Sequence, residues 1–187
     1  MSGLFFTGGH EYIPGMILLI TGHGKGKTTA SLGQALRAVG DGKRVLMVQF
    51  IKGPWRSGED ESQMLLRPAF KIVKTGLGFV GILGDTRPLE EHASAARDGL
   101  LFARTEMLSG RWDMLILDEV NNAIALELLD NADVLELVHA LPNTMDLVLT
   151  GRDAPQALID SADIVSEVRE IKHPYQQGQQ GKKGIEW

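Results

Sequence analysis

The stretch Thr21-Gly22-His23-Gly24-Lys25-Gly26-Lys27-Thr28-Thr29 is the part of this chain that decides its fold. It follows the apolar run MILLI at 16–20, which is short and branched enough to be a buried strand. It precedes residues 30–39, in which apolar side chains recur at helical spacing. A strand, a glycine-rich turn and a helix that opens on Lys-Thr together predict a phosphate-binding loop.

The chemistry of such a loop follows from its residue types. Glycines allow backbone N–H groups to converge on an anion, and the start of the helix adds the positive end of its macrodipole. Lys27 would reach phosphate oxygens, and the Thr28 hydroxyl would bind Mg²⁺. The usual pattern, G-x-x-x-x-G-K-[ST], asks for glycine where this chain has Thr21, so a glycine-rich turn without a ligand is the alternative. The flanking strand and helix favour nucleotide binding.

The composition is that of an ordinary globular protein. The chain has 187 residues, 43% of them hydrophobic and 23% charged, which predicts one domain over 16–187 after an irregular lead-in at 1–15. A net charge of −5 argues against a broad surface for nucleic acid. The absence of cysteine excludes disulfides, thiolate metal sites and cysteine nucleophiles. With no apolar run of membrane-spanning length and no signal-peptide pattern, we expect no membrane partner and a cytoplasmic location.

Strand patterns alternate with helix patterns along the whole chain. The expected strands are 16–20, 43–51, 71–75, 113–119, 146–152 and 162–171. The expected helices are 30–39, a short one within 52–69, a long one that Asp85 or Thr86 caps and that ends near 109, two in 121–141, and 155–161. This order predicts a three-layer, P-loop NTPase-like (RecA-like) α/β fold with a mostly parallel sheet. Ligands of such sheets lie beyond the carboxyl ends of the strands.

Two adjacent carboxylates, Asp118 and Glu119, end a hydrophobic strand. A carboxylate in that place can hold Mg²⁺ while a nucleotide supplies phosphate oxygens, and the alternative is a cap for the helix near 121. Arg152 follows another strand and could contact phosphate, sugar or a carboxylate, or form a surface salt bridge. The apolar, glycine-rich loop at 75–84 is a candidate cover for a large hydrophobic ligand, although composition alone favours a loop packed on its own core.

Taken together, these segments resemble one family, the P-loop type of ATP:corrinoid (cob(I)alamin or cob(I)yrinic acid a,c-diamide) adenosyltransferase. The resemblance covers about residues 16–187, and the combination of motifs is specific although no single motif is. The matching segments are T-G-x-G-K-G-K-T-T at 21–29, V-Q-F-I-K-G at 48–53, W-x-x-G-E at 55–59, L-D-E at 117–119, T-G-R at 150–152, A-D-x-V-S-E at 162–167, K-H-P at 172–174 and G-I-E at 184–186.

The resemblance implies transfer of the 5′-deoxyadenosyl group of ATP to the Co(I) of a reduced corrinoid, with release of triphosphate. In the family, ATP lies in the loop in a reversed sense, so the triphosphate is the leaving group. Carried over residue by residue, the catalytic residues are Lys27, Thr28 and Glu119, and the ligands of Mg²⁺ or Mn²⁺ are Thr28, Asp118 and Glu119. ATP would contact Gly22, Gly24, Lys25, Gly26, Lys27, Thr28, Thr29 and Arg152, and the corrinoid would contact Trp55, Glu59, Gly78 and Phe79.

This chain departs from the family pattern in two places. Family members often carry G-x-G-F-T-W in the corrinoid loop, and here Phe79 is kept while Gly81 stands at the tryptophan position. The chain begins only about fifteen residues before the first expected strand, so we expect the N-terminal lid helix of some members to be missing or replaced. The resemblance also implies a homodimer and a reductant protein such as a flavoprotein.

Three other functions fit parts of the sequence. A P-loop hydrolase or kinase would use the loop in the usual sense, with Glu119 as the candidate base. A corrinoid or nucleotide sensor would bind without transfer, and the glycine at 81 motivates that hypothesis. A nucleic-acid-dependent ATPase is disfavoured by the acidic balance.

Overall fold

The computed structural model describes residues 14–82, 84–179 and 181–186. Within them, six strands form one sheet in the order β3-β2-β4-β5-β1-β6, and every neighbouring pair is parallel. The strands are β1 (Ile17–Thr21), β2 (Val45–Gln49), β3 (Phe70–Lys74), β4 (Met114–Asp118), β5 (Asp146–Thr150) and β6 (Ile164–Glu167). The predicted three-layer α/β fold with a parallel sheet is confirmed.

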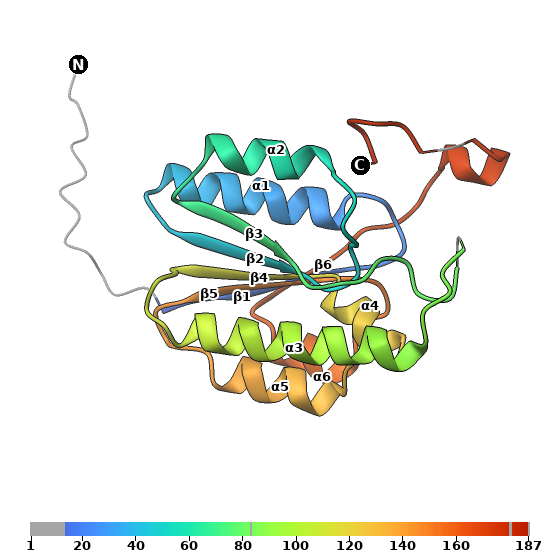
Figure 1. Ribbon diagram of the computed structural model, residues 1–187. Helices are drawn as coiled ribbons and strands as arrows, with labels where there is room; N and C mark the ends of the chain where they lie inside the picture. Colours follow the sequence, from blue (N-terminus) through green and yellow to red (C-terminus); the bar gives the residue numbers. More distant parts are fainter. Residues whose placement is uncertain (1–13, 83, 180, 187) are drawn as a thin grey trace, which may run out of the picture.

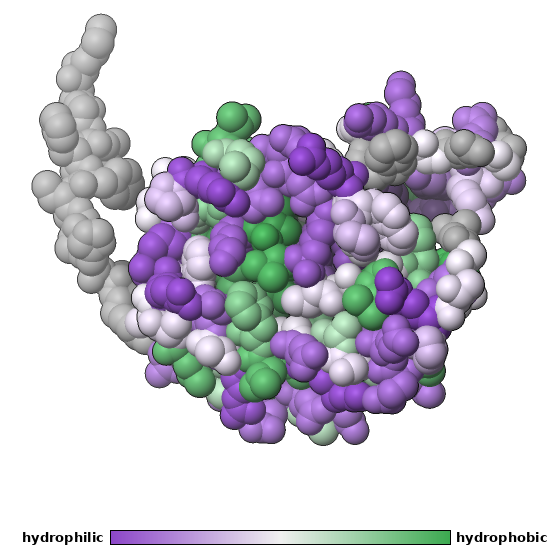
Figure 2. Space-filling view, in the orientation of Figure 1, coloured by the Kyte–Doolittle hydropathy of each residue, from purple (hydrophilic) through white to green (hydrophobic). Residues whose placement is uncertain are grey.

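Helices cover both faces of the sheet, as Figure 1 shows, with α1 and α2 on one face and α3 to α6 on the other. The bounds are α1 (Lys27–Gly40), α2 (Gly58–Leu65), α3 (Leu89–Met107), α4 (Val120–Ala125), α5 (Asn131–His139), α6 (Gln156–Ser161) and the 3₁₀ helix η1 (Pro174–Gln177). Figure 2 shows polar residues over much of the outer surface in that view, with apolar residues between them. No helix in the described ranges is both long and apolar enough to cross a membrane.

The core is split into two layers because neighbouring side chains on a strand point to opposite faces of the sheet. Leu19 of β1 packs in the layer under α3, α5 and α6, whereas Ile20 packs in the layer under α1. The central strands β2 and β4 are buried along their whole length. The sequences of β2 and β4 are therefore almost continuously apolar, as is usual for strands that helices cover on both faces.

Several expected boundaries differ from the structure. Pro88 occupies the N-cap position of α3, so the prediction that Asp85 or Thr86 caps this helix is wrong. Asp85 instead bonds within the preceding loop, where its carboxylate accepts from two backbone N–H groups. Strand β6 is shorter than expected because backbone pairing with β1 covers only residues 164–167. Most of the lead-in at 1–15 lies outside the described residues.

The register brings the carboxyl ends of four strands to one edge. Gln49 of β2 lies opposite Asp118 of β4, and Ile20 of β1 lies opposite Thr150 of β5. All these strands run in one direction, so the loops that follow them meet at the right-hand end of the sheet in Figure 1. This is the edge at which parallel α/β sheets hold ligands.

Candidate active site

The phosphate loop lies against the segment that follows β6. A Cβ atom at Gly22, where φ is +98°, would lie 2.5 Å from the carbonyl oxygen of Val168, and one at Gly24 would lie 2.7 Å from the carbonyl carbon of Arg169. The N–H of Gly24 donates to the Val168 oxygen at 2.8 Å. Close backbone approach therefore explains why this loop carries more glycine than the usual pattern requires.

The position of Thr21 has its own explanation. Its hydroxyl oxygen accepts a hydrogen bond from the N–H of Ala154 at 3.3 Å and so ties the start of the loop to the segment between β5 and α6. A glycine at this position would leave that N–H without its partner. The departure from the usual first glycine is thus compatible with an intact loop.

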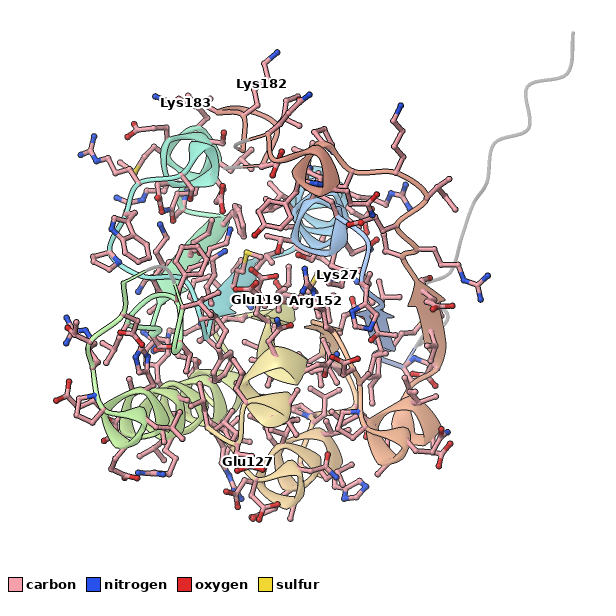
Figure 3. The ribbon with its side chains drawn as sticks, turned by 90° about the vertical axis from the view of Figure 1, so that its right-hand side faces the viewer. Lys27, Glu119, Glu127, Arg152, Lys182 and Lys183 are labelled. Atoms are coloured by element: carbon pink, nitrogen blue, oxygen red, sulfur yellow. The ribbon has the colours of Figure 1, made fainter. Side chains whose placement is uncertain are left out.

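Lys27 opens α1 from within the loop. Its ammonium donates to the carbonyl oxygen of Gly24 at 2.8 Å, which closes the loop on itself. Burial and the nearby charge of Arg152 lower the pKa of Lys27, while Glu119 and Asp118 oppose that shift. Figure 3, which views the molecule from the carboxyl end of the strands, shows Lys27, Glu119 and Arg152 close together at the centre.

Asp118 is the hub of the site and is fully buried. One of its oxygens accepts from the Thr28 hydroxyl at 2.9 Å and from the Thr150 hydroxyl at 2.8 Å. The other accepts from the Gln49 amide at 3.0 Å. Burial raises the pKa of Asp118, and the charge of Lys52 together with these hydrogen bonds acts in the opposite direction. The loop, β2, β4 and β5 are therefore joined through one carboxylate.

Glu119 follows the strand with a left-handed backbone, at φ 63°. It stands at the N-cap position of α4, but its side chain makes no capping hydrogen bond, so the alternative role as a helix cap is not supported. Its N–H donates to the Thr150 hydroxyl oxygen at 2.9 Å. Burial and the neighbouring Asp118 raise the pKa of Glu119 to about 7. A carboxylate this disfavoured in its charged form is suited to a cation.

The donor set of the site suits a hard divalent cation. Thr28, Asp118 and Glu119 offer only oxygen atoms, the ligands that Mg²⁺ and Mn²⁺ prefer. Oε1 of Gln49, beside Asp118, is buried and has no hydrogen-bond partner in the described residues. No cluster of three or more acidic, histidine or cysteine side chains there could hold a metal by itself. A cation here would need further oxygens, which the phosphates of a nucleotide carry.

An exposed aromatic pair lies at the same edge. Trp55 and Phe79 are 59% and 46% exposed, and their ring centroids are 5.6 Å apart. The Trp55 ring covers Gly78, where a Cβ would lie 2.5 Å from the ring. Phe79 is thus not buried, as it would be if this loop were packed on its own core. Large, exposed rings held over glycine offer an apolar platform to a ligand.

Four other expected site residues in the described ranges form no hydrogen bond or ion pair with Asp118. Glu59 forms an ion pair with Lys52, and although burial alone would raise its pKa, the hydrogen bond from Lys52 holds the pKa of Glu59 below its usual value. Arg152 is exposed, and its N–H donates to the side-chain oxygen of Asn122 at 2.8 Å. Lys25 and Thr29 are also exposed.

The sequence analysis missed the roles of three polar residues in this site. Gln49 and Thr150 each end a buried strand, and both donate to Asp118. Lys52 follows β2, and its charge lowers the pKa of both Asp118 and Glu119. A polar residue at the end of an otherwise apolar strand was the signal available for the first two.

The sequence of this chain matches a known protein family over nearly its whole length. The model of the family described as ATP:corrinoid adenosyltransferase BtuR/CobO/CobP matches residues 14–187. This chain belongs to the ATP:corrinoid adenosyltransferase family. It is 36% identical over 176 residues to the corrinoid adenosyltransferase of Escherichia coli (strain K12), covering 92% of this chain and 86% of the relative. Identity and coverage are the same for corrinoid adenosyltransferase CobA of Salmonella typhimurium (strain LT2).

More distant members of the family also align over most of this chain. A corrinoid adenosyltransferase of Pseudomonas aeruginosa is 31% identical over 173 residues, covering 92% of this chain and 84% of the relative. The family's reaction transfers the adenosyl group of ATP to a corrinoid, so the resemblance drawn from the motifs is confirmed.

Proposed function

We propose that the site at the carboxyl end of the sheet carries out this transfer, with ATP in the phosphate loop and the corrinoid beside Trp55 and Phe79. The observation that supports it best is the 2.9 Å hydrogen bond between Thr28 and Asp118. It joins the phosphate loop to the buried acidic strand end, and the aromatic pair comes from the loops that follow β2 and β3 at the same end of the sheet. ATP and a corrinoid could therefore meet over one set of residues.

The proposed reaction is a nucleophilic displacement at carbon. Co(I) of the reduced corrinoid attacks C5′ of ATP, a Co–C5′ bond forms, and the C5′–O5′ bond breaks. Its electron pair leaves with triphosphate. No general base is needed, because the attacking atom carries no proton. The protein would contribute positioning and stabilisation of the leaving group's charge.

Lys27, Thr28 and Glu119 are the residues we assign to that stabilisation. Lys27 would exchange its bond to the Gly24 oxygen for the triphosphate, since its ammonium already lies within the loop. Arg152 lies near Lys27 and would add a second positive charge. Backbone N–H groups of Gly22, Lys25, Gly26 and Thr29 would complete the ATP contacts. Gly24 would contact ATP through the rest of its backbone, because its N–H donates to the carbonyl oxygen of Val168.

The residues present fit a divalent cation, Mg²⁺ or Mn²⁺, bound by Thr28 and Glu119 with Asp118. When bound, the cation would neutralise negative charge on the triphosphate. Asp118 would contribute mainly by orienting Thr28, since its oxygens already accept from three side chains. Glu119 has no side-chain hydrogen bond at its helix start, which leaves its carboxylate free for this role.

The corrinoid contacts we propose are Trp55, Phe79, Gly78 and Glu59. Phe79 and Trp55 offer the exposed rings, and Gly78 allows the Trp55 ring to lie over the loop backbone. Glu59 forms an ion pair with Lys52, whose charge favours the ionised forms of Asp118 and Glu119. Because this chain has glycine at 81, where family members often have tryptophan, Trp55 supplies the second aromatic ring beside Phe79.

We also propose a reductant, a cellular location and an oligomeric state for this protein. Co(I) requires reduction of the corrinoid before transfer, so a reductant protein such as a flavoprotein would act upstream. An ATP-consuming synthesis suits the cytoplasm. We further propose a homodimer and a single catalytic domain over 16–187.

An anaerobic assay tests the proposed function. Purified protein, Mg–ATP and chemically reduced cob(I)alamin should yield light-sensitive adenosylcobalamin and an equal amount of triphosphate, followed by absorbance and by phosphate-product analysis. ADP and phosphate without an alkylated corrinoid would instead indicate a hydrolase that uses the loop in the usual sense. Binding of both substrates without product would indicate a sensor.

A further inference from the structure

Phe79 lies in the loop between β3 and α3, whose backbone conformation depends on the glycines on either side of it. Gly78 has a φ of +117° and Gly81 a φ of +68°, and both angles disfavour residues with a side chain. In Figure 1 this loop extends beyond the end of the sheet, between β3 and α3. Glycines on both sides of Phe79 leave its ring free to move unless something else holds the loop.

Asp85 supplies that restraint from within the loop. Its Oδ2 accepts from the N–H of Gly81 at 2.9 Å, and its Oδ1 accepts from the N–H of Arg87 at 3.2 Å. The backbone N–H groups of Gly81 and Arg87 hold the pKa of Asp85 below its usual value. The carboxylate thus closes a turn of which Gly81 is the first residue.

His92 ties this turn to the core. Its Nε2 lies 3.0 Å from Asp85 Oδ2, and since a carboxylate only accepts, Nε2 is the donor. The His92 side chain is only 2% exposed and the Asp85 side chain 10%. His92 belongs to α3, and the next residue, Ala93, packs in the core layer under that helix. The backbone N–H of Gly81 is therefore linked through the side chains of Asp85 and His92 to helix α3.

We propose that Asp85 and His92 are positioning residues that hold Phe79 in place for the corrinoid. The inference rests on the proposed function of Phe79. It also gives a reason for glycine at 81, where the family often carries a tryptophan, because the N–H bonds to Asp85 in a backbone conformation, φ +68°, that disfavours a side chain. Without this anchor the loop would have to become ordered on binding, so corrinoid binding would weaken while ATP binding would not.

Steady-state kinetics of variants test the proposal. His92→Leu, which removes one hydrogen bond to Asp85, should raise the KM for the corrinoid about tenfold. Asp85→Ala, which removes three, should raise it at least as much, and both variants should leave the KM for ATP unchanged. His92→Gln should restore much of the loss because its amide can donate to Asp85. Glu91→Gln is the matched control, since Glu91 forms an exposed ion pair with Arg87 beside the same loop. It should leave both KM values unchanged.

A double-mutant cycle separates the possible outcomes. If Asp85 acts through Phe79, Asp85→Ala should add little to the corrinoid KM of Phe79→Ala. Additive effects, or equal increases in the KM for ATP, would overturn the proposal and leave Asp85 a general structural role. If Phe79→Ala by itself leaves the corrinoid KM unchanged, the proposed function of Phe79 is wrong. Because His92 is buried, thermal melting is used to detect any variant of it that does not fold. In that case the corrinoid KM of Asp85→Ala, a substitution in the loop, decides whether the proposal holds.

Discussion

At the scale of single residues, the site is organised by buried groups whose charges need partners. Asp118 is fully buried, and its oxygens accept from Thr28, Thr150 and Gln49. Removal of one donor would leave a buried acceptor with fewer partners, which costs more than the hydrogen bond alone contributes. Glu119 and Lys27 are less enclosed by such bonds, and both are therefore better placed to exchange partners during a reaction.

Lys27→Ala should reduce kcat/KM for adenosyl transfer by about a hundredfold or more, because a charged donor to the leaving group is lost. The anaerobic assay described above measures this directly. Lys71→Ala is a suitable control, since Lys71 is an exposed lysine of β3. Near-normal turnover of Lys27→Ala would remove Lys27 from the mechanism.

The raised pKa of Glu119 predicts a pH effect on the metal-free protein. A carboxyl group whose pKa is about 7 in the folded protein binds a proton more tightly there than in the unfolded chain. Its ionisation therefore destabilises the fold as the pH rises from about 4.5 to about 7, the interval between the unfolded and folded pKa values.

Glu119→Gln removes that ionisation and should be more stable than the unmodified protein at pH 8, by about 3 kcal/mol, and by much less at pH 5. Urea unfolding in EDTA at the two pH values measures the difference. An equal effect of the substitution at both would show that Glu119 is not the group responsible. With metal present, the same variant should need more Mg²⁺ for activity.

At the scale of elements, helix α2 is tied to strand β3 through its first turn. Asp60 accepts from the N–H of Ser57 at 2.7 Å in a capping box and from the ammonium of Lys74 at 2.6 Å. Lys74 also donates to the carbonyl oxygen of Trp55 at 2.7 Å. The same charge cluster thus fixes the helix start and the backbone that carries one of the two exposed rings.

Asp60→Ala should lower the free energy of unfolding by about 1 to 2 kcal/mol at pH 7 through loss of the cap and the ion pair. Burial alone would raise the pKa of Asp60, but the Lys74 hydrogen bond holds it below its usual value. The contribution is therefore present at neutral pH and lost as the pH falls through the folded-state pKa, below about 4. Chemical unfolding at several pH values checks this. Glu61→Ala, at an exposed neighbour, should have little effect.

At the scale of the whole molecule, the strand order decides which loops meet. Strand β4 lies between β2 and β5, and β1 lies between β5 and β6, so loops that are distant in sequence share one edge. Elements from both halves of the chain therefore build the site. Ligand binding there should stabilise the fold as a unit.

Mg–ATP at about a hundred times its Kd should stabilise the protein by about 2.7 kcal/mol, which raises Tm by roughly 5 to 10 °C for a domain of this size. Differential scanning fluorimetry with and without EDTA measures the shift. The Lys27→Ala variant should show a much smaller one. A shift of the same size in the variant would place the nucleotide elsewhere.

Local pattern was enough to predict the phosphate loop, the alternation of strands and helices, the parallel sheet and the acidic strand end. Each depends on residue type and spacing within a short stretch. The start of α3 was mispredicted because Asp85 is a good capping residue locally, but in the structure its carboxylate bonds to Gly81 and faces His92.

Tertiary structure alone decided which side chains Asp118 meets. Its partners Thr28, Gln49 and Thr150 are 90, 69 and 32 positions away in the chain. Those bonds depend on strand order and register, which no local periodicity encodes. The meeting of Trp55 with Phe79 has the same cause, since β2 and β3 are paired and the loops after them emerge side by side.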